Sequence, residues 1–312
     1  MPVNEGHLTT ADGLRLFFQT LGSGPQTIVI PNGLYLLRDV ERLAKGRTLV
    51  AYDVRNRGRS DSVEDAAKLK RGIENDVDDL EVVRRYFRLD KLNLIGHSYI
   101  GLMVILFAMK HPDVIDRIVQ IGPTEPAFGK TYPAHLTGAS ADSTLRDVMA
   151  RLAPLQQERE ALDPVEMCRK FWSILGLIYV TDPSNTDRVV DWGRCELPNE
   201  RNFMKYWMGV IIPSLKGIDV TREAAAAVKA PVLTIHGRRD RSTPYGGARD
   251  WAMRLPNARL VTVENGGHAP WIEAPDIVFE SMETFFSGAW PKAAERLRPN
   301  AQCPMPNDVV GH

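Results

Sequence analysis

The sequence predicts an α/β fold in which helices flank a mostly parallel sheet and an all-helical insertion interrupts the alternation. Short apolar segments typical of buried strands alternate with segments of helical periodicity before residue 123 and after residue 223. Between those two positions no clear strand pattern occurs. Alternation at this pitch is typical of βαβ units, whose strands lie parallel within one sheet.

Five strands and two helices are expected before the insertion. The strand segments are short, apolar and bounded by turn residues: 14–21, 27–30, 48–52, 92–95 and 117–121. A helix is expected before the fourth strand, because apolar side chains recur there at helical spacing: Ile73, Val77, Leu80, Val83 and Phe87. A second, strongly apolar helix is expected from Tyr99 to about Lys110.

The insertion is expected to be helical and rich in aromatic residues. Large side chains recur in it at helical spacing: Cys168, Phe171, Trp172, Leu175, Ile178 and Tyr179. Strands at 232–236 and 259–263, with helices at about 246–255 and 271–286, then resume the alternation. The predicted organisation is a core domain at residues 1–123 and 223–290, a helical cap at 124–222 and an irregular, proline-rich tail at 291–312.

Composition and charge exclude several classes of protein. The 312 residues include 39 Lys and Arg and 39 Asp and Glu, so no net field attracts nucleic acid or an anionic membrane. The polar N-terminus does not resemble a secretory signal, and the longest apolar run, residues 100–109, is about half the length that a bilayer needs. Three cysteines without a C-x-x-C pair predict no disulfide framework and a cytoplasmic location.

The segment GHSYIG at residues 96–101 is the strongest functional signal. It lies between a predicted buried strand and a predicted apolar helix, which is the context of a nucleophile elbow. Such a turn holds its serine, here Ser98, in a strained backbone conformation, so the residues two positions away must be small. Gly96 meets this requirement, whereas Ile100 stands where the G-x-S-x-G pattern has its second glycine. The segment predicts a nucleophilic serine with one departure from the pattern.

A nucleophilic serine needs a base, and the base needs a carboxylate that orients it. In proteins with this turn, the carboxylate and then the histidine follow the serine along the chain. Asp240 and His268 occur in that order, each in a loop after a predicted strand, where open α/β sheets place their sites. After an early strand, Leu34 can present its backbone N–H to an oxyanion, and the N–H of Tyr99 is the second expected donor.

The chain resembles α/β-hydrolase fold proteins that carry a helical cap, over about residues 10–290. Besides the motifs above, the segment DVRNRGRS at residues 53–60 is similar to the D-x-R-G-x-G-x-S loop of that family. The resemblance implies that Ser98, Asp240 and His268 are the nucleophile, the acid and the base. It also implies chemistry without a metal ion or an organic cofactor.

Two further positions bear on this resemblance. Glu125, just past the fifth predicted strand, is a rival for the acid, because some members of the family draw their acid from that place. Asn32 stands where the family often has a histidine. This second departure matters less, because the oxyanion donors are backbone groups.

Four side chains of the insertion are candidates for contact with a substrate. Trp172 and Trp207 belong to a set of aromatic residues there, of which one or two are expected to face Ser98. Proline iminopeptidase-like members of the family use cap carboxylates to hold a substrate's free amine, and segment 195–200, which contains Glu196 and Glu200, is compatible with that role. The alternative interpretation is that both are exposed loop acids.

No motif for a metal or a phosphate group is found. Asp76, Asp78 and Asp79 lack the ligand and glycine spacing of a calcium loop, and no histidine pair has the spacing of zinc ligands. The pattern G-x-x-x-x-G-K-[ST] does not occur. No metal ion and no cofactor are therefore expected.

The sequence thus predicts an enzyme that hydrolyses a carboxylic ester or an amide through an acyl-enzyme. The expected partner is a small molecule or a short peptide, and neither nucleic acid nor a membrane is expected to bind. Two alternatives stay open. One is an aminopeptidase similar to proline iminopeptidases, and the other is a non-hydrolytic member of the same fold, such as a lyase or a ligand receptor.

Overall fold

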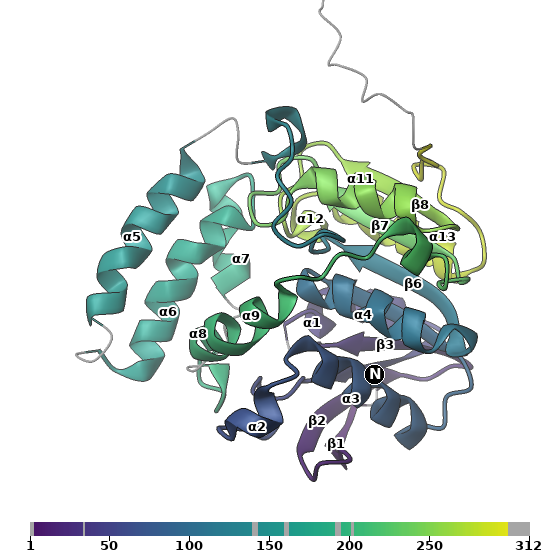
Figure 1. Cartoon of the computed structure of the whole chain (residues 1–312), viewed down its shortest axis with the longest axis horizontal. Coiled ribbons are helices and arrows are strands. Elements are labelled where there is room, and N and C mark those ends of the chain that lie inside the picture. Colours follow the sequence, from purple (N-terminus) through teal and green to yellow (C-terminus); the bar gives the residue numbers. More distant parts are fainter. Residues whose placement is uncertain are drawn as a thin grey trace, which may run out of the picture.

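The structure is a computed structural model in which helices cover a central sheet (Figure 1). It describes residues 3–33, 35–138, 143–158, 162–190, 195–200 and 203–298. The eight strands of the sheet lie in the order β1-β2-β4-β3-β5-β6-β7-β8. Their bounds are β1 Val3–Thr9, β2 Arg15–Gly22, β3 Gln26–Pro31, β4 Arg47–Tyr52, β5 Leu92–His97, β6 Ile115–Ile121, β7 Val232–Gly237 and β8 Ala258–Val263.

The sheet is mostly parallel, as predicted. β2 pairs antiparallel with β1 and β4, and every other neighbouring pair is parallel. β1 was not expected, because its sequence is largely polar. It forms an edge strand that pairs with β2 over seven positions and buries Leu8. An edge strand needs few apolar side chains, so the hydrophobic pattern from which the other strands were predicted is weak there.

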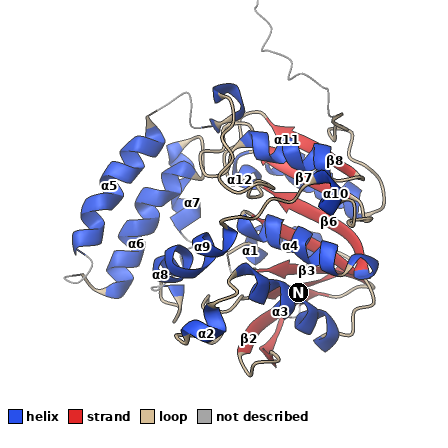
Figure 2. Cartoon of the chain, in the orientation of Figure 1, coloured by secondary structure: helices blue, strands red, loops and turns tan. Residues whose placement is uncertain are grey.

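Helices cover both faces of the sheet (Figure 2). The helices that pack on one face are α3 Ile73–Tyr86, α4 Tyr99–Lys110 and α11 Tyr245–Arg254, and those on the other face are α1 Leu37–Val40, α12 Pro270–Glu273 and α13 Pro275–Phe286. The single helix expected at 271–286 is divided in two. Pro275 begins α13, because proline fits the first turn of a helix and cannot continue a preceding one.

A helical insertion separates β6 from β7. Its α-helices are α5 Thr144–Glu158, α6 Pro164–Leu175, α7 Thr186–Val190, α8 Phe203–Tyr206 and α9 Ile212–Leu215, with a π-helix at Trp207–Ile211. The two ends of the insertion meet in a short antiparallel bridge between Ala127 and Asp219. The chain therefore leaves and re-enters the sheet domain at one place, although the domain boundaries at residues 123 and 223 stay a prediction.

Short helices complete the connections. The remaining α-helices are α2 Ala66–Leu69 and α10 Arg222–Ala225, and 3₁₀ helices occur at Glu41–Ala44, Pro112–Val114, Ala134–Leu136, Gly176–Ile178 and Pro183–Asn185. Beyond α13, Glu295 forms a bridge with Leu260 of β8, so the first part of the tail lies against the edge of the sheet. Among the described helices, none combines the length and the apolar character needed to cross a membrane.

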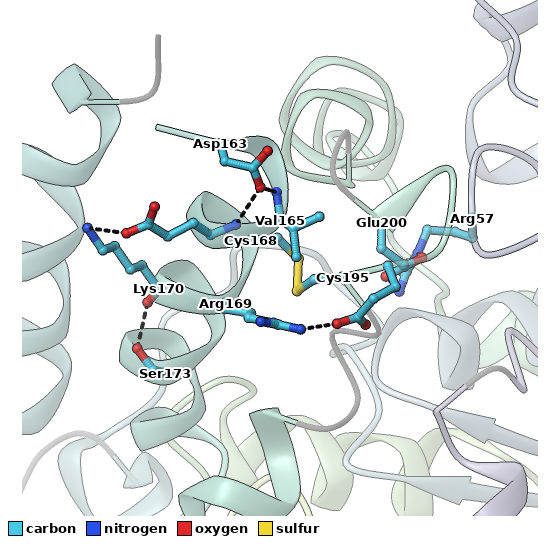
Figure 3. The surroundings of a disulfide bond; sticks show 11 residues. Arg57, Asp163, Val165, Cys168, Arg169, Lys170, Ser173, Cys195 and Glu200 are labelled. Carbon is cyan, nitrogen blue, oxygen red and sulfur yellow. Dashed lines mark hydrogen bonds and ion pairs between the residues drawn. A yellow bond between two sulfur atoms is a disulfide. The ribbon is translucent and has the colours of Figure 1, made fainter. Parts of the chain in front are cut away.

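Cys168 of α6 and Cys195 form a disulfide, with their Cα atoms 5.6 Å apart (Figure 3). The prediction of no disulfide framework is therefore wrong. Cys303, the third cysteine, lies outside the described residues, and the other two meet because segment 195–200 runs past α6. The cytoplasmic location stays a prediction, and the cysteine count no longer supports it.

Candidate active site

Ser98 lies in a sharp turn between β5 and α4. Its backbone angles are φ 60° and ψ −128°, a combination that residues other than glycine rarely adopt. Neighbouring main-chain groups hold the turn in place. Ser98 donates its N–H to the carbonyl of Ile121 at 3.0 Å, and the N–H groups of Gly101 and Thr124 donate to the carbonyl of Ser98 at 2.9 and 3.1 Å. The strained turn expected from GHSYIG is present.

Ile100 is compatible with this turn. Its side chain is fully buried in the apolar core under α3 and α4. The close approaches fall on two glycines instead. A Cβ atom at Gly96 would lie 2.7 Å from the carbonyl oxygen of Ile100, and one at Gly101 would lie 2.7 Å from Cβ of Pro123. Gly101, one position later than the pattern requires, is therefore the second residue that must stay small.

The expected oxyanion donors are only partly described. Tyr99 is the first residue of α4, and the first N–H groups of a helix have no acceptor within it. Leu34, the other expected donor, lies outside the described residues. Just before it, Asn32 has a positive φ of 53°, and a Cβ atom at Gly33 would lie 2.4 Å from Cβ of Ala51. The chain thus turns tightly against β4 beside the site.

Asp240 and His268 meet at the carboxyl ends of β7 and β8. Oδ2 of Asp240 lies 2.8 Å from Nδ1 of His268, and both side chains are completely buried. Since an ionised carboxylate only accepts hydrogen bonds, Nδ1 carries the proton of the neutral ring and Nε2 bears a lone pair. Nε2 makes no hydrogen bond with any described residue. The pair has the tautomer that a general base needs.

Several donors stabilise the Asp240 carboxylate. Oδ1 accepts the N–H groups of Ser242 and Thr243 at 2.7 and 2.9 Å, and Oδ2 accepts the Thr243 hydroxyl at 2.8 Å. Nε2 of His236 lies 3.3 Å from Oδ2. Burial raises the pKa of Asp240, but the charges and hydrogen bonds of His268 and His236 outweigh it and hold that pKa well below its usual range. The carboxylate is thus ionised at neutral pH.

Glu125, the rival acid, has other contacts. It lies four residues past the end of β6, and its Oε1 accepts the N–H of Gly129 at 2.7 Å. No hydrogen bond joins the described side chains of Glu125 and His268. Burial raises the pKa of Glu125, so this carboxyl is harder to ionise than Asp240. The described contacts pair His268 with Asp240.

No hydrogen bond joins the described side chains of Ser98 and His268, but residues next to Ser98 and to its hydrogen-bond partner approach the His268 ring. The ring of His268 is 4.5 Å from the ring of His97, the residue that precedes Ser98. A Cβ atom at Gly122, which follows the hydrogen-bond partner of Ser98, would lie 3.1 Å from Nδ1 of His268. Hydrogen bonds between catalytic groups are often long without substrate. The geometry is compatible with a triad, and the roles of its members stay a prediction.

Ser98 faces a cavity of about 410 Å³. The helical insertion supplies most of its apolar wall, which includes Phe171, Trp172, Leu175, Ile178, Trp207 and Ile212. Polar groups come mainly from the sheet side, among them Thr124, Glu125 and Thr243. The cavity therefore joins a polar floor at the carboxyl ends of the strands to an apolar cover from the insertion.

Of the four substrate-contact candidates, two lie on this wall and two do not. Trp172 and Trp207 line the cavity. Glu200 is buried and does not line the cavity itself: its two oxygens accept from Nε and Nη2 of Arg57, which does, at 2.7 and 2.9 Å (Figure 3). Glu196 is exposed and pairs with Arg169.

The expectation that Glu196 and Glu200 hold a substrate amine finds no support in this geometry. Neither is among the described residues that line the cavity. Arg57 already neutralises Glu200, whose Oε1 also accepts the N–H of Gly58 at 3.0 Å. Glu196 is an exposed acid, as the alternative interpretation expects, whereas Glu200 is buried against Arg57. The sequence gives no sign of this second contact, because the two residues are distant along the chain.

Two residues that hold the site together were missed. Thr243 binds the Asp240 carboxylate through its N–H and its hydroxyl. The D-x-x-T spacing, typical of an Asx turn, was a usable signal for it. Glu273 accepts the N–H of Gly267, beside His268, at 2.6 Å. No sequence pattern singles out Glu273, the last residue of α12, from other acids near helix ends.

Metal-ligating side chains do not gather at the site. No group of three or more histidine, cysteine, aspartate or glutamate side chains suited to a metal ion occurs within the described ranges. The expectation that neither a metal ion nor a cofactor takes part stays a prediction.

The comparisons with known proteins agree with this arrangement. A family model of the alpha/beta hydrolase fold matches residues 27–275. A proline iminopeptidase from Heyndrickxia coagulans is 23% identical over 287 residues, which cover 87% of this chain and 94% of that protein. A pimeloyl-[acyl-carrier protein] methyl ester esterase from Nitrosomonas europaea is 29% identical over 187 residues, covering 60% of this chain and 68% of the esterase.

Solved structures show the same fold. An esterase from Exiguobacterium antarcticum superimposes with a TM-score of 0.68 at 18% sequence identity, covering 90% of this chain and 99% of the esterase. At that identity the likeness concerns the fold alone. The family model spans most of the chain. The chain therefore belongs to the α/β-hydrolase fold family, a family of hydrolases.

Proposed function

We propose that this protein is a serine hydrolase that cleaves a carboxylic ester or an amide bond through an acyl-enzyme. Ser98 is the nucleophile, His268 the base and Asp240 the carboxylate that orients it. One observation carries the proposal: the Asp240–His268 pair, with its 2.8 Å hydrogen bond, lies beside the strained turn that presents Ser98 to the cavity. A weak nucleophile, an unprotonated nitrogen and a buried carboxylate are the parts that such a mechanism needs.

The reaction proceeds in two steps. Oγ of Ser98 attacks the carbonyl carbon while Nε2 of His268 takes the hydroxyl proton, and Asp240 stabilises the imidazolium that forms. The N–H groups of Tyr99 and Leu34 receive the oxyanion. The leaving alcohol or amine departs with the proton from Nε2. Water then gives its proton to the same nitrogen and attacks the acyl carbon, which releases the acid and restores Ser98.

The cavity supports an apolar acyl or leaving group. Its insertion side is built from aliphatic and aromatic side chains, so polar substrate groups would lose their hydration there without gaining partners. The insertion also covers the base: the ring of Tyr179 lies 4.8 Å from that of His268, and the N–H of Ala269 donates to the carbonyl of Tyr179. We infer that it acts as a cap that excludes water and selects substrates.

The test combines labelling with a panel of substrates. A fluorophosphonate probe should label Ser98 stoichiometrically, and p-nitrophenyl esters of graded acyl length should show kcat/KM rising with length until the chain outgrows the cavity. Failure of both labelling and hydrolysis would refute the proposal. Labelling without turnover of any ester or amide would favour the lyase or receptor alternative.

A second candidate is an aminopeptidase that removes an N-terminal residue such as proline. The observation in its favour is Glu125, the one acidic side chain among the described residues of the cavity wall. A substrate ammonium group would stabilise its ionised form, which burial disfavours.

The two candidates differ in their response to a free amine. An aminopeptidase would cleave a prolyl arylamide faster than its N-blocked form, and Glu125→Gln would remove that preference. Glu196→Gln, at an exposed acid away from the cavity, is the matched control. Equal rates for the free and blocked arylamides, or a preference that survives Glu125→Gln, would remove this candidate.

A further inference from the structure

His97 is a buried histidine that the mechanism above does not use. It ends β5 and directly precedes Ser98. Its ring lies between three aromatic neighbours, with centroid distances of 5.8 Å to Tyr35, 4.8 Å to Trp271 and 4.5 Å to His268. Only 2% of the residue is exposed. A polar ring in this position needs partners for both of its nitrogens.

Both nitrogens of His97 have partners, and these fix its tautomer. Nε2 lies 3.0 Å from the main-chain carbonyl oxygen of His268. A carbonyl oxygen only accepts, so Nε2 carries a proton. Nδ1 lies 3.0 Å from the hydroxyl of Tyr35. In the neutral ring Nδ1 has no proton, so the Tyr35 hydroxyl donates to it.

Burial, together with the neighbouring histidines, keeps His97 neutral. Burial is the largest effect and lowers its pKa well below the usual range. Positive charge on His268 or His236 lowers it further, while Asp240 and the His268 carbonyl act in the opposite direction and are outweighed. This matters for the reaction, because His268 becomes positive in the first step and a second cation 4.5 Å away would oppose that change.

The contact to the His268 carbonyl is one of several that hold the base loop, residues 264–269. Among the others, Gly267 donates its N–H to Glu273 at 2.6 Å, and Ala269 donates to the carbonyl of Tyr179 at 2.9 Å. The link from His97 differs from these two because it comes from the strand that precedes Ser98. It therefore connects the main chain of the base directly to the residue before Ser98.

We propose that His97, neutral and protonated at Nε2, is a positioning residue that fixes the His268 main chain relative to Ser98, and that the Tyr35 hydroxyl maintains the required tautomer. The inference rests on the proposed function. Its physical basis is that displacement of a catalytic group by about 1 Å can cost on the order of 100-fold in rate. The Tyr35–His97–His268 chain joins the segment after β3, the end of β5 and the loop after β8.

Two substitutions of His97 separate positioning from packing. Glutamine can place an N–H where Nε2 lies, so His97→Gln keeps the donor to the His268 carbonyl. His97→Leu has a comparable volume without a donor. We expect His97→Leu to lower kcat about 10- to 100-fold with KM within twofold of wild type, and His97→Gln to recover most of that loss.

The Tyr35 hydroxyl is tested through a double-mutant cycle. Tyr35→Phe should lower kcat several-fold, and combining it with His97→Leu should add nothing, because both changes break the same chain. The rate of Ser98 labelling by a fluorophosphonate should fall in parallel with kcat. Full activity of His97→Leu, a His97→Gln variant as poor as His97→Leu, or additive losses in the double variant would overturn the inference.

A measurement on the wild-type protein keeps the inference falsifiable if the variants do not fold. Nitrogen-15 NMR of the labelled histidines should show His97 with a proton on Nε2 and a bare Nδ1 from pH 5 to pH 8. A proton on Nδ1 in that range would overturn the proposal. This readout does not depend on turnover. Absence of hydrolysis and of Ser98 labelling in the wild type would instead mark the failure of the proposed function.

Discussion

The two sides of the cavity are built in different ways. On the sheet side, each candidate residue follows the end of a parallel strand: Ser98 follows β5, Glu125 follows β6, Asp240 follows β7 and His268 follows β8. On the other side, helices of the insertion form the wall, and strand pairing does not hold them. The contacts that stabilise the insertion include the Cys168–Cys195 disulfide and the Arg57–Glu200 ion pair (Figure 3).

We therefore expect the sheet side to carry the chemistry and the insertion side to determine selectivity. A strand end cannot shift without breaking hydrogen bonds to its neighbouring strands, so the sheet fixes the positions of Ser98, Asp240 and His268. The insertion depends on a few contacts between segments that are distant in sequence. Changes on the sheet side should therefore abolish turnover with little loss of stability. Substitutions that remove the disulfide or the ion pair should lower the free energy of unfolding and alter substrate selectivity without abolishing turnover.

The largest expected effect is that of Ser98→Ala. Removal of the nucleophile should lower kcat on the order of a millionfold, as for serine hydrolases with a working triad. Single-turnover hydrolysis of a p-nitrophenyl ester gives the measurement. Ser242→Ala, at another serine on the cavity wall, should cost less than tenfold. A Ser98→Ala protein that keeps most of its activity would mean that the sheet side does not hold the nucleophile.

Asp240→Asn should have the next largest effect. The amide keeps the shape of the carboxylate but favours the wrong tautomer of His268, and the expected loss in kcat is about 10⁴-fold. Glu125→Gln is the matched control, since Glu125 makes no hydrogen bond to His268 and should cost less than tenfold on neutral esters. A larger loss for Glu125→Gln than for Asp240→Asn would reverse the assignment of the acid.

These first two predictions concern the part of the molecule that the sequence predicts well. Strand and helix periodicity located seven of the strands, and the α4 helix was expected at its observed bounds. Because strand ends meet at one edge of a parallel sheet, loops that are distant in sequence can be placed together without coordinates. This is why Asp240 and His268, which lie 28 residues apart, could be paired in advance.

The insertion resisted prediction for a physical reason. Its helices are held by contacts between residues that no periodic pattern relates, such as Arg57 with Glu200, 143 residues apart. Cys168 and Cys195 meet only because of the path of the chain between them. Trp172 and Trp207 reach the cavity wall, yet nothing in their spacing distinguishes them from aromatic residues in the core of the insertion. Composition indicated a helical insertion rich in aromatic residues but did not indicate the disulfide or the ion pair that stabilises it.

Glu200→Gln tests the contribution of the Arg57–Glu200 ion pair to stability. It leaves the buried Arg57 charge without its counterion, which should lower the free energy of unfolding by about 3–5 kcal/mol. Glu196→Gln, at the exposed pair with Arg169, should cost about 0–1 kcal/mol. Urea unfolding of the two variants provides the comparison. Equal losses would show that the Arg57–Glu200 pair does not hold the insertion to the sheet domain.

The disulfide should contribute somewhat less. The two cysteines are 27 residues apart, and loss of such a cross-link costs about 2–4 kcal/mol. Since α6 carries Phe171 and Trp172 on the cavity wall, we also expect the double variant Cys168→Ser/Cys195→Ser to discriminate less between short and long acyl esters. A reducing agent should reproduce both changes in the wild type and leave the double variant unaffected. A wild type that does not respond to the reducing agent would show that the disulfide does not stabilise the insertion.

The smallest expected effect is a pH dependence of stability at Asp53, a buried carboxyl beside Arg59 that senses the charges of Arg57 and Glu200. Burial raises the pKa of Asp53 to about 7, although the N–H of Arg59 donates to its carboxylate at 3.1 Å. The folded protein therefore keeps this proton up to about pH 7, whereas the unfolded chain releases it near 3.8. The stabilising contribution is complete below pH 3.8 and is lost as the pH rises through 7.

Asp53→Asn removes this titration, so the comparison of its stability with that of the wild type isolates the group. Relative to the variant, the wild type should lose about 1 kcal/mol between pH 6 and pH 8, as measured by urea unfolding. Asp61→Asn is the control, because the Arg15 pair counteracts burial and lowers the pKa of Asp61, so that this group is already ionised throughout that range. If the difference in free energy of unfolding between wild type and Asp53→Asn stays constant over this range, Asp53 is ionised in the folded protein. The surroundings of its carboxylate would then be more hydrated than its burial implies.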